Sequence, residues 1–330
     1  MISWFEAVLL LLSIASAMLW IHRGVGIWPD VPTNRDQPPI GTTASHWSLI
    51  PQWVPFGLVD CLVVFLAWVS IGSVLVSVFV GAFGDNPASI HFGLTIASLV
   101  VVLGASWIFL FAYPTSRSWL IETGQPISKL LADGIRRCVM ILPPLLLVHR
   151  VFSDWVPYEH KTLSALSAHR DALTIVALWL SAVVAAPIYE EFFFRGVLLH
   201  WFGHVQQMWR VGVLPIVWGA WGYRRASAAT APPPSLIGSP GADTANAGTT
   251  SAAKQEVGNV WFPVLASSAI FGAMHWQHGL AAVPLFGLGV FLAVLALKTK
   301  SCWPPILVHA LFNGYSMAWE TLRVVLGGDT

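Results

Sequence analysis

The chain has 330 residues, of which 56% are apolar and only 10% are charged, whereas about 25% of residues are charged in an ordinary soluble domain. Lys and Arg number 17 and Asp and Glu number 16, so the net charge of +1 offers no excess of positive charge for a nucleic-acid backbone. With a mean hydropathy of +0.69, this composition disfavours both a water-soluble globule and a nucleic-acid-binding protein. The partner that we expect is the lipid bilayer.

Long runs without ionised side chains predict an all-α protein, a polytopic integral membrane helical bundle of about eight transmembrane helices. The first run resembles a signal peptide because Ala15-Ser16-Ala17 is similar to a cleavage site, but it carries Glu6 and no positive charge precedes it. We therefore expect an uncleaved first span. In chain order, the predicted spans lie at 2–21, 57–83, 90–113, 138–152, 173–203, 260–275, 281–297 and 303–322.

Two further segments lie between the fifth and sixth predicted spans. The run 211–223 is too short, and too interrupted by Gly and Pro, to cross about 30 Å of hydrocarbon, so we expect an interfacial or re-entrant segment. Between 226 and 250, 21 of 25 residues are Ala, Pro, Ser, Thr or Gly, a composition typical of a disordered linker. The predicted organisation is an N-terminal membrane region of about four spans (1–171), a core (172–322) with an insertion at about 224–258, and a C-terminal tail (323–330).

Ionisable residues inside predicted spans are costly and therefore informative. The fifth span contains Glu190, Glu191 and Arg195. At helical spacing Glu191 and Arg195 lie one turn apart and can pair, whereas Glu190 points about 100° away and is left as a candidate general base. Pro187 removes a backbone donor and should bend the helix, which would open space for water beside the carboxylate.

Two later spans each contain a polar pair at a spacing of four residues. Phe271 can pack beneath the imidazole of His275, and one helix face presents His309 and Asn313 together. These side chains, with the glutamates, can supply a base, a group that holds water and donors for an oxyanion. Taken singly, each is also compatible with an interhelical hydrogen bond, a structural ion pair or part of a transport path.

In this order, the three motifs resemble those of the CPBP family, intramembrane proteases related to the type II CAAX prenyl endopeptidase and to bacteriocin-processing and immunity (Abi-like) proteins. The resemblance covers about residues 172–322 and includes Gly287 and Gly289. It implies that Glu190 activates the hydrolytic water, that His275 helps to hold this water, that His309 and Asn313 stabilise the oxyanion, and that Glu191, Arg195 and Phe271 support the site.

A metal is a possible cofactor, because the family has been described both as metalloproteases and as metal-independent glutamate proteases. The sequence lacks HExxH, yet Glu190, His275 and His309 would suffice for a three-ligand zinc site. We interpret His200 and His204 as interfacial histidines at a helix end rather than as metal ligands. The three cysteines are far apart and indicate neither a disulfide framework nor a metal site.

The function that we expect is intramembrane endopeptidase activity of the CAAX-protease type, in which a Glu-activated water hydrolyses a peptide bond of a membrane-associated protein or peptide. The predicted location is multi-pass in the plasma (inner) membrane. One alternative is a catalytically silent scaffold or immunity protein that keeps the fold. A transporter is less favoured, because the sequence shows no internal repeat.

Overall fold

The computed structural model describes residues 8, 10–16, 54–113, 116, 126–155, 161–169, 171–210 and 260–325. Within these residues the regular elements are helices and there is no strand, as the sequence predicts. The predicted interfacial run at 211–223 and the low-complexity stretch at 226–250 lie outside the described residues. So does most of the predicted first span.

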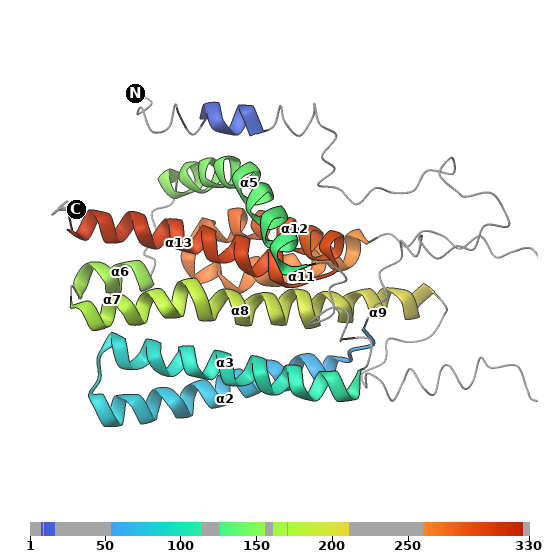
Figure 1. Cartoon of the computed structure of the whole chain (residues 1–330), viewed down its shortest axis with the longest axis horizontal. Helices are drawn as coiled ribbons and strands as arrows, with labels where there is room; N and C mark the ends of the chain where they lie inside the picture. Colours follow the sequence, from blue (N-terminus) through green and yellow to red (C-terminus); the bar gives the residue numbers. More distant parts are fainter. Residues whose placement is uncertain are drawn as a thin grey trace, which may run out of the picture.

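The first two long helices, α2 (Leu58–Phe83) and α3 (Pro87–Ala112), pack along each other as a hairpin (Figure 1). Asn86 caps α3, because its side chain accepts a hydrogen bond of 2.9 Å from the N–H of Ser89, and proline follows at the first helical position. The close packing requires Gly93, where a Cβ atom would lie only 2.8 Å from the Cα of Val76.

The predicted fifth span is a continuous helical rod that is longer than expected. It begins with α7 (Ala172–Trp179) and ends with α9 (Leu199–Arg210). Between them lie a π-helical segment at Leu180–Ala185, α8 (Ala186–Glu191) and a second π-helical segment at Phe192–Leu198. The first π-helical segment ends two residues before Pro187, so the departure from α-helix lies just ahead of the residue that has no N–H to donate.

This rod lies between the α2–α3 hairpin and the remaining helices (Figure 1). On the far side from the hairpin, α13 (Trp303–Val325) packs against α8 and α11 (Trp261–Met274) packs against α9. A 3₁₀ turn (Trp276–Ala281) connects α11 to α12 (Ala282–Thr299), and these two helices pack against each other. The remaining helices are α5 (Ile127–Trp155), which packs against α13, and α6 (Lys161–Ala168).

Four of the described helices are long and apolar enough to cross a membrane, namely Leu58–Phe83, Pro87–Ala112, the rod Ala172–Trp209 and Ala282–Thr299. They correspond to four of the predicted spans. The predicted span at 260–275 is a shorter apolar helix, α11, and those at 138–152 and 303–322 lie within α5 and α13, which are not among the four. The protein is therefore an all-α integral membrane protein, and the predicted count of eight spans is not confirmed.

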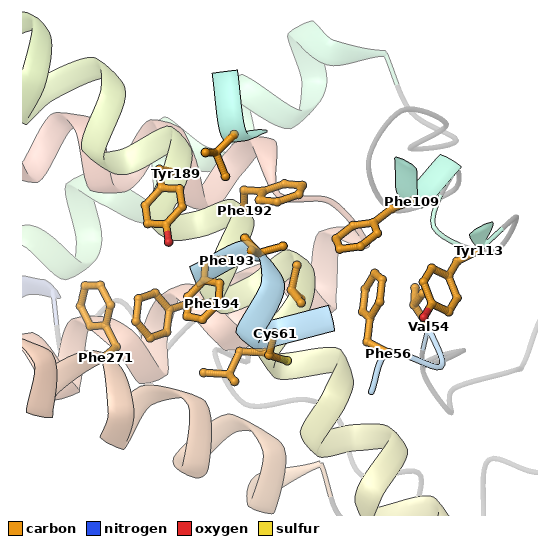
Figure 2. Packing of buried hydrophobic residues seen from close by; sticks show 14 residues of the cluster. Val54, Phe56, Cys61, Phe109, Tyr113, Tyr189, Phe192, Phe193, Phe194 and Phe271 are labelled. Atoms are coloured by element: carbon orange, nitrogen blue, oxygen red, sulfur yellow. The ribbon is translucent and has the colours of Figure 1, made fainter. Parts of the chain in front are cut away.

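Aromatic side chains join the rod to both of its neighbours (Figure 2). On one side Phe192 stacks against Phe109 of α3, with ring centroids 6.2 Å apart. On the other side the ring of Phe194 meets the ring of Phe271 in α11 edge-on at 5.0 Å. Because three consecutive phenylalanines are buried in the second π-helical segment, the rod is held firmly directly beside the two glutamates.

His200 and His204 lie in α9, the last helix of the rod, and contact protein in a way that the sequence did not predict. Both side chains are buried in α9 and bind the chain segment that leads into α2. The N–H of Val54 donates to His200 Nδ1 at 3.1 Å, and His204 Nδ1 donates to the carbonyl oxygen of Phe56 at 3.3 Å. Helical periodicity could not reveal this contact, since it joins segments about 150 residues apart.

Candidate active site

The centre of the site is the carboxylate of Glu191, which is fully buried. Its Oε1 accepts a hydrogen bond of 3.0 Å from Arg195 Nη1 and one of 2.8 Å from His309 Nδ1. The predicted pair of Glu191 and Arg195 is therefore confirmed, although the intervening backbone is π-helical rather than α-helical. A buried ion pair needs further hydrogen bonds to offset desolvation, and His309 supplies one of them.

Arg195 is itself 1% exposed and connects the rod to α11 and α12. Its Nη2 donates to the carbonyl oxygen of Gly289 at 3.1 Å, and its guanidinium carbon lies 4.7 Å from the centre of the Phe271 ring. A Cβ atom at Gly289 would come within 3.2 Å of the Phe271 ring, so glycine allows the two helices to approach this closely. The motifs alone did not reveal this carbonyl contact, although Gly289 belongs to the resemblance.

The imidazole of His309 lies between the carboxylates of the two glutamates. A carboxylate only accepts hydrogen bonds, so the contact with Glu191 assigns the proton of His309 to Nδ1 and leaves Nε2 on the opposite side of the ring. Nε2 lies 3.8 Å from Oε2 of Glu190, which is beyond hydrogen-bonding distance. The sequence predicted that Glu190 would point away from the Glu191–Arg195 pair, but not that one imidazole would face both carboxylates.

Glu190 differs from Glu191 in its surroundings. The Glu190 side chain is 23% exposed, whereas that of Glu191 is 0% exposed. Among the described residues, Oε2 of Glu190 has no hydrogen-bond partner even though the atom itself is buried. Oε2 of Glu191 likewise has no hydrogen-bond partner among the described residues, but Glu191 is fully buried and held through Oε1. Glu190 differs because its acceptor atom belongs to a partly exposed side chain, which a small molecule can reach.

Phe271 and His275 come from the end of α11. His275 follows the last helical residue, and its Nδ1 donates to the carbonyl oxygen of Phe271 at 2.7 Å. The two rings pack with centroids 4.9 Å apart, as the spacing predicted, and the Phe271 ring also lies 5.7 Å from that of His309. Phe271 thus contacts both imidazoles and the guanidinium of Arg195.

Asn313 lies one turn after His309 in α13, but its amide is directed to a different partner. Its Nδ2 donates to the backbone carbonyl oxygen of Ala182 at 2.9 Å, in the first π-helical segment. The structure therefore brings Glu190, Glu191, Arg195 and His309 together, with Phe271 and His275 beside them. The oxyanion role that the resemblance implies for Asn313 stays a prediction.

Comparison with known protein families assigns the region that carries this site. The family model described as Type II CAAX prenyl endopeptidase Rce1-like matches residues 172–238 and 248–315. This region is Rce1-like. The match includes all the residues of the site and confirms the resemblance predicted from the three motifs. No curated protein and no solved structure shows significant similarity to the chain.

A zinc ion was the cofactor that the sequence left possible. Glu190 Oε2 and His309 Nε2 face each other across 3.8 Å, but a protein site for catalytic zinc needs three ligands. Among the residues that the structure describes, no group of three His, Cys, Asp or Glu side chains is arranged to hold a metal ion. The Rce1-like region therefore supports a membrane peptidase, and this arrangement does not support a metalloprotease.

Proposed function

We propose that the Rce1-like region is an intramembrane endopeptidase that hydrolyses a peptide bond of a membrane-associated protein or peptide with a water molecule activated by Glu190. The observation that carries the proposal is the 3.8 Å separation of Glu190 Oε2 and His309 Nε2. His309 is held there by a buried series of hydrogen bonds, in which Arg195 and His309 both donate to Glu191. Hydrolysis needs a base beside a bound water molecule. The gap between Glu190 Oε2 and His309 Nε2 is suited to hold this water beside Glu190, and we refer to it below as the gap.

The gap accepts a water molecule on simple geometry. An oxygen atom about 2.8 Å from both Glu190 Oε2 and His309 Nε2 forms a triangle with them and hydrogen-bonds to each. Glu190 removes a proton from this water as its oxygen bonds to the carbonyl carbon of the substrate. The C–N bond then breaks, the leaving nitrogen takes the proton from Glu190, and the products are a carboxylic acid and an amine. No covalent acyl-enzyme is formed.

His309 is suited to stabilise the oxyanion that develops on the carbonyl oxygen. When His309 is an imidazolium before the attack, it donates to Glu191 from Nδ1, and the N–H at Nε2 first donates to the water oxygen and then to the oxyanion. Two carboxylates, one guanidinium and one imidazolium sum to zero charge before the attack. After it Glu190 is neutral and the oxyanion carries the negative charge instead, so the sum stays zero, which limits the cost of burying these groups. The resemblance implies a further role for His275 in holding the water.

The test is cleavage of quenched-fluorescent peptides, prenylated and unprenylated, by the full chain purified in lipid nanodiscs. Removal of a general base lowers the rate by about 10²- to 10⁴-fold, so we expect Glu190→Gln to lose activity to this extent while its melting temperature stays unchanged. Asp85→Asn is the matched control, because it makes the same chemical change at an exposed loop position outside the site.

Three outcomes would contradict the proposal. Full activity of Glu190→Gln would remove Glu190 from the role of base. Absence of cleavage by the wild-type chain, in native lipid as well as in nanodiscs and with both classes of peptide, would favour a catalytically silent scaffold or immunity protein. Activity that is lost with a chelator and restored by zinc would replace water activation by Glu190 alone with a metal-dependent mechanism.

A further inference from the structure

The backbone hydrogen bonds of the rod are interrupted eight residues before Glu190. At the end of the first π-helical segment, the N–H of Ala186 donates to the carbonyl oxygen of Ser181, five residues earlier. In the same register the next donor would be residue 187 and its acceptor would be the carbonyl oxygen of Ala182. Residue 187 is proline and has no N–H, so the helix cannot provide this hydrogen bond.

The missing donor is replaced from another helix. Asn313 in α13 donates from Nδ2 to the carbonyl oxygen of Ala182 at 2.9 Å. The donor is the amide NH₂ group, because a carbonyl oxygen only accepts. α13 packs against the rod at this point, since a Cβ atom at Gly314, the next residue, would be in ordinary van der Waals contact with Val183 at 3.6 Å.

We propose that Asn313 is a positioning residue, which satisfies the carbonyl of Ala182 left open by Pro187 and thereby fixes the part of the rod that carries Glu190. The same helix, α13, holds His309, so one element sets both ends of the gap between Glu190 and His309. This assignment differs from the oxyanion role that the resemblance implies. It rests on the proposed function in so far as Glu190 is the base.

The consequence is that Asn313 and Pro187 are coupled. Without Asn313, the carbonyl of Ala182 has lost its donor, and the backbone relaxes by moving the turn that precedes Glu190. An alanine at position 187 restores the N–H that the helix lacks. Pro187→Ala should therefore compensate for the loss of Asn313 if Asn313 acts by binding the carbonyl of Ala182. An N–H that donates within the rod cannot replace a donor to the oxyanion, so Pro187→Ala should give no compensation if Asn313 acts there.

The experiment is a double-mutant cycle with Asn313→Leu, which keeps the approximate shape of the side chain without its polar atoms, and Pro187→Ala. Both kcat and KM for the peptide and the melting temperature are measured for all four proteins. We expect Asn313→Leu to lower kcat by roughly 10- to 100-fold with KM nearly unchanged. Adding Pro187→Ala should restore about tenfold of that loss and part of the melting temperature.

Pro143→Ala is the matched control, since it restores an N–H within α5, a helix that carries none of the site residues. We expect it to give no recovery when combined with Asn313→Leu. The cycle is repeated with Asn313→Ala, which keeps the test valid if the leucine variant does not fold. Additive effects on kcat and on melting temperature in both cycles would overturn the proposal and favour a direct oxyanion contact.

The two proposals fail in different ways. Wild-type activity of Glu190→Gln together with coupled melting temperatures would refute the proposed base and leave the contact between Asn313 and Ala182 in place. Loss of activity in Glu190→Gln together with additive behaviour of Asn313 and Pro187 would refute the positioning role alone.

Discussion

The α2–α3 hairpin and the Rce1-like site both contain a carboxylate within apolar helices, but the two carboxylates have different surroundings. Oδ2 of Asp60 accepts hydrogen bonds from the N–H of Gly57 and the hydroxyl of Tyr113, each 2.7 Å long. Oε2 of Glu190 has no hydrogen-bond partner among the described residues. Since a buried polar group without a partner is costly, the comparison separates a carboxylate that stabilises the fold from one that is available for chemistry.

The largest expected effect would come from removing the cation of the site. Arg195→Leu leaves Glu191 buried without its charge partner, and breaking a buried pair in this way lowers the free energy of unfolding by about 3–5 kcal/mol. Peptidase activity should fall with it, because Glu191 also orients His309. Denaturant titration followed by tryptophan fluorescence measures the first effect. A variant with unchanged stability would show that the pair contributes no net stabilisation.

Asp60→Ala tests the other side of the comparison. It removes the acceptor of two hydrogen bonds, each worth roughly 1.5–3 kcal/mol when one partner is charged, so we expect the free energy of unfolding to fall by about 3 kcal/mol. Activity per folded molecule should be unchanged. If kcat fell while stability stayed the same, the division between structural and chemical carboxylates would be wrong.

Gly93→Ala examines the hairpin without touching a polar group. The added Cβ atom would lie 2.8 Å from the backbone of Val76, which cannot move without shifting α2. Overpacking of this kind costs about 2 kcal/mol, which the melting temperature would report. Gly81→Ala is the matched control, because nothing lies within 4 Å of a Cβ atom at that position in α2.

The smallest expected effect concerns Asp171, the exposed N-cap of α7. The N–H and the hydroxyl of Thr174 donate to this carboxylate and hold its pKa below the ordinary value. Its ionised form therefore favours folding above the unfolded pKa of about 3.9, and this contribution is lost as the pH falls through the lower pKa of the folded state. Melting curves between pH 6 and pH 3 should show a slightly steeper loss for wild type than for Asp171→Asn. Parallel curves would contradict this.

The parts of the site that could be predicted from the sequence depend on local spacing. The pair Glu191–Arg195 and the packing of Phe271 on His275 both follow from residues four positions apart on one helix. The long apolar helices α2, α3 and α12 follow from composition alone. The C-terminal end of the rod was less predictable, because the apolar run stops before its last turns, which contain Gln206 and Gln207.

The parts that could not be predicted depend on backbone atoms brought together from distant segments. Nothing in a motif indicates that Arg195 binds the carbonyl of Gly289, or that Asn313 binds that of Ala182. The contacts of His200 and His204 could not be predicted for the same reason, since their partners belong to the segment before α2. A side chain pattern gives the face of a helix, whereas these contacts depend on how closely two helices approach.

The uninterrupted length of the rod also constrains how it can cross a bilayer. Its membrane-spanning stretch, Ala172–Trp209, has 38 residues. About 20 helical residues suffice to cross a hydrocarbon layer of about 30 Å. The helix that carries Glu190 must therefore tilt strongly or extend beyond the hydrocarbon layer into the headgroup region.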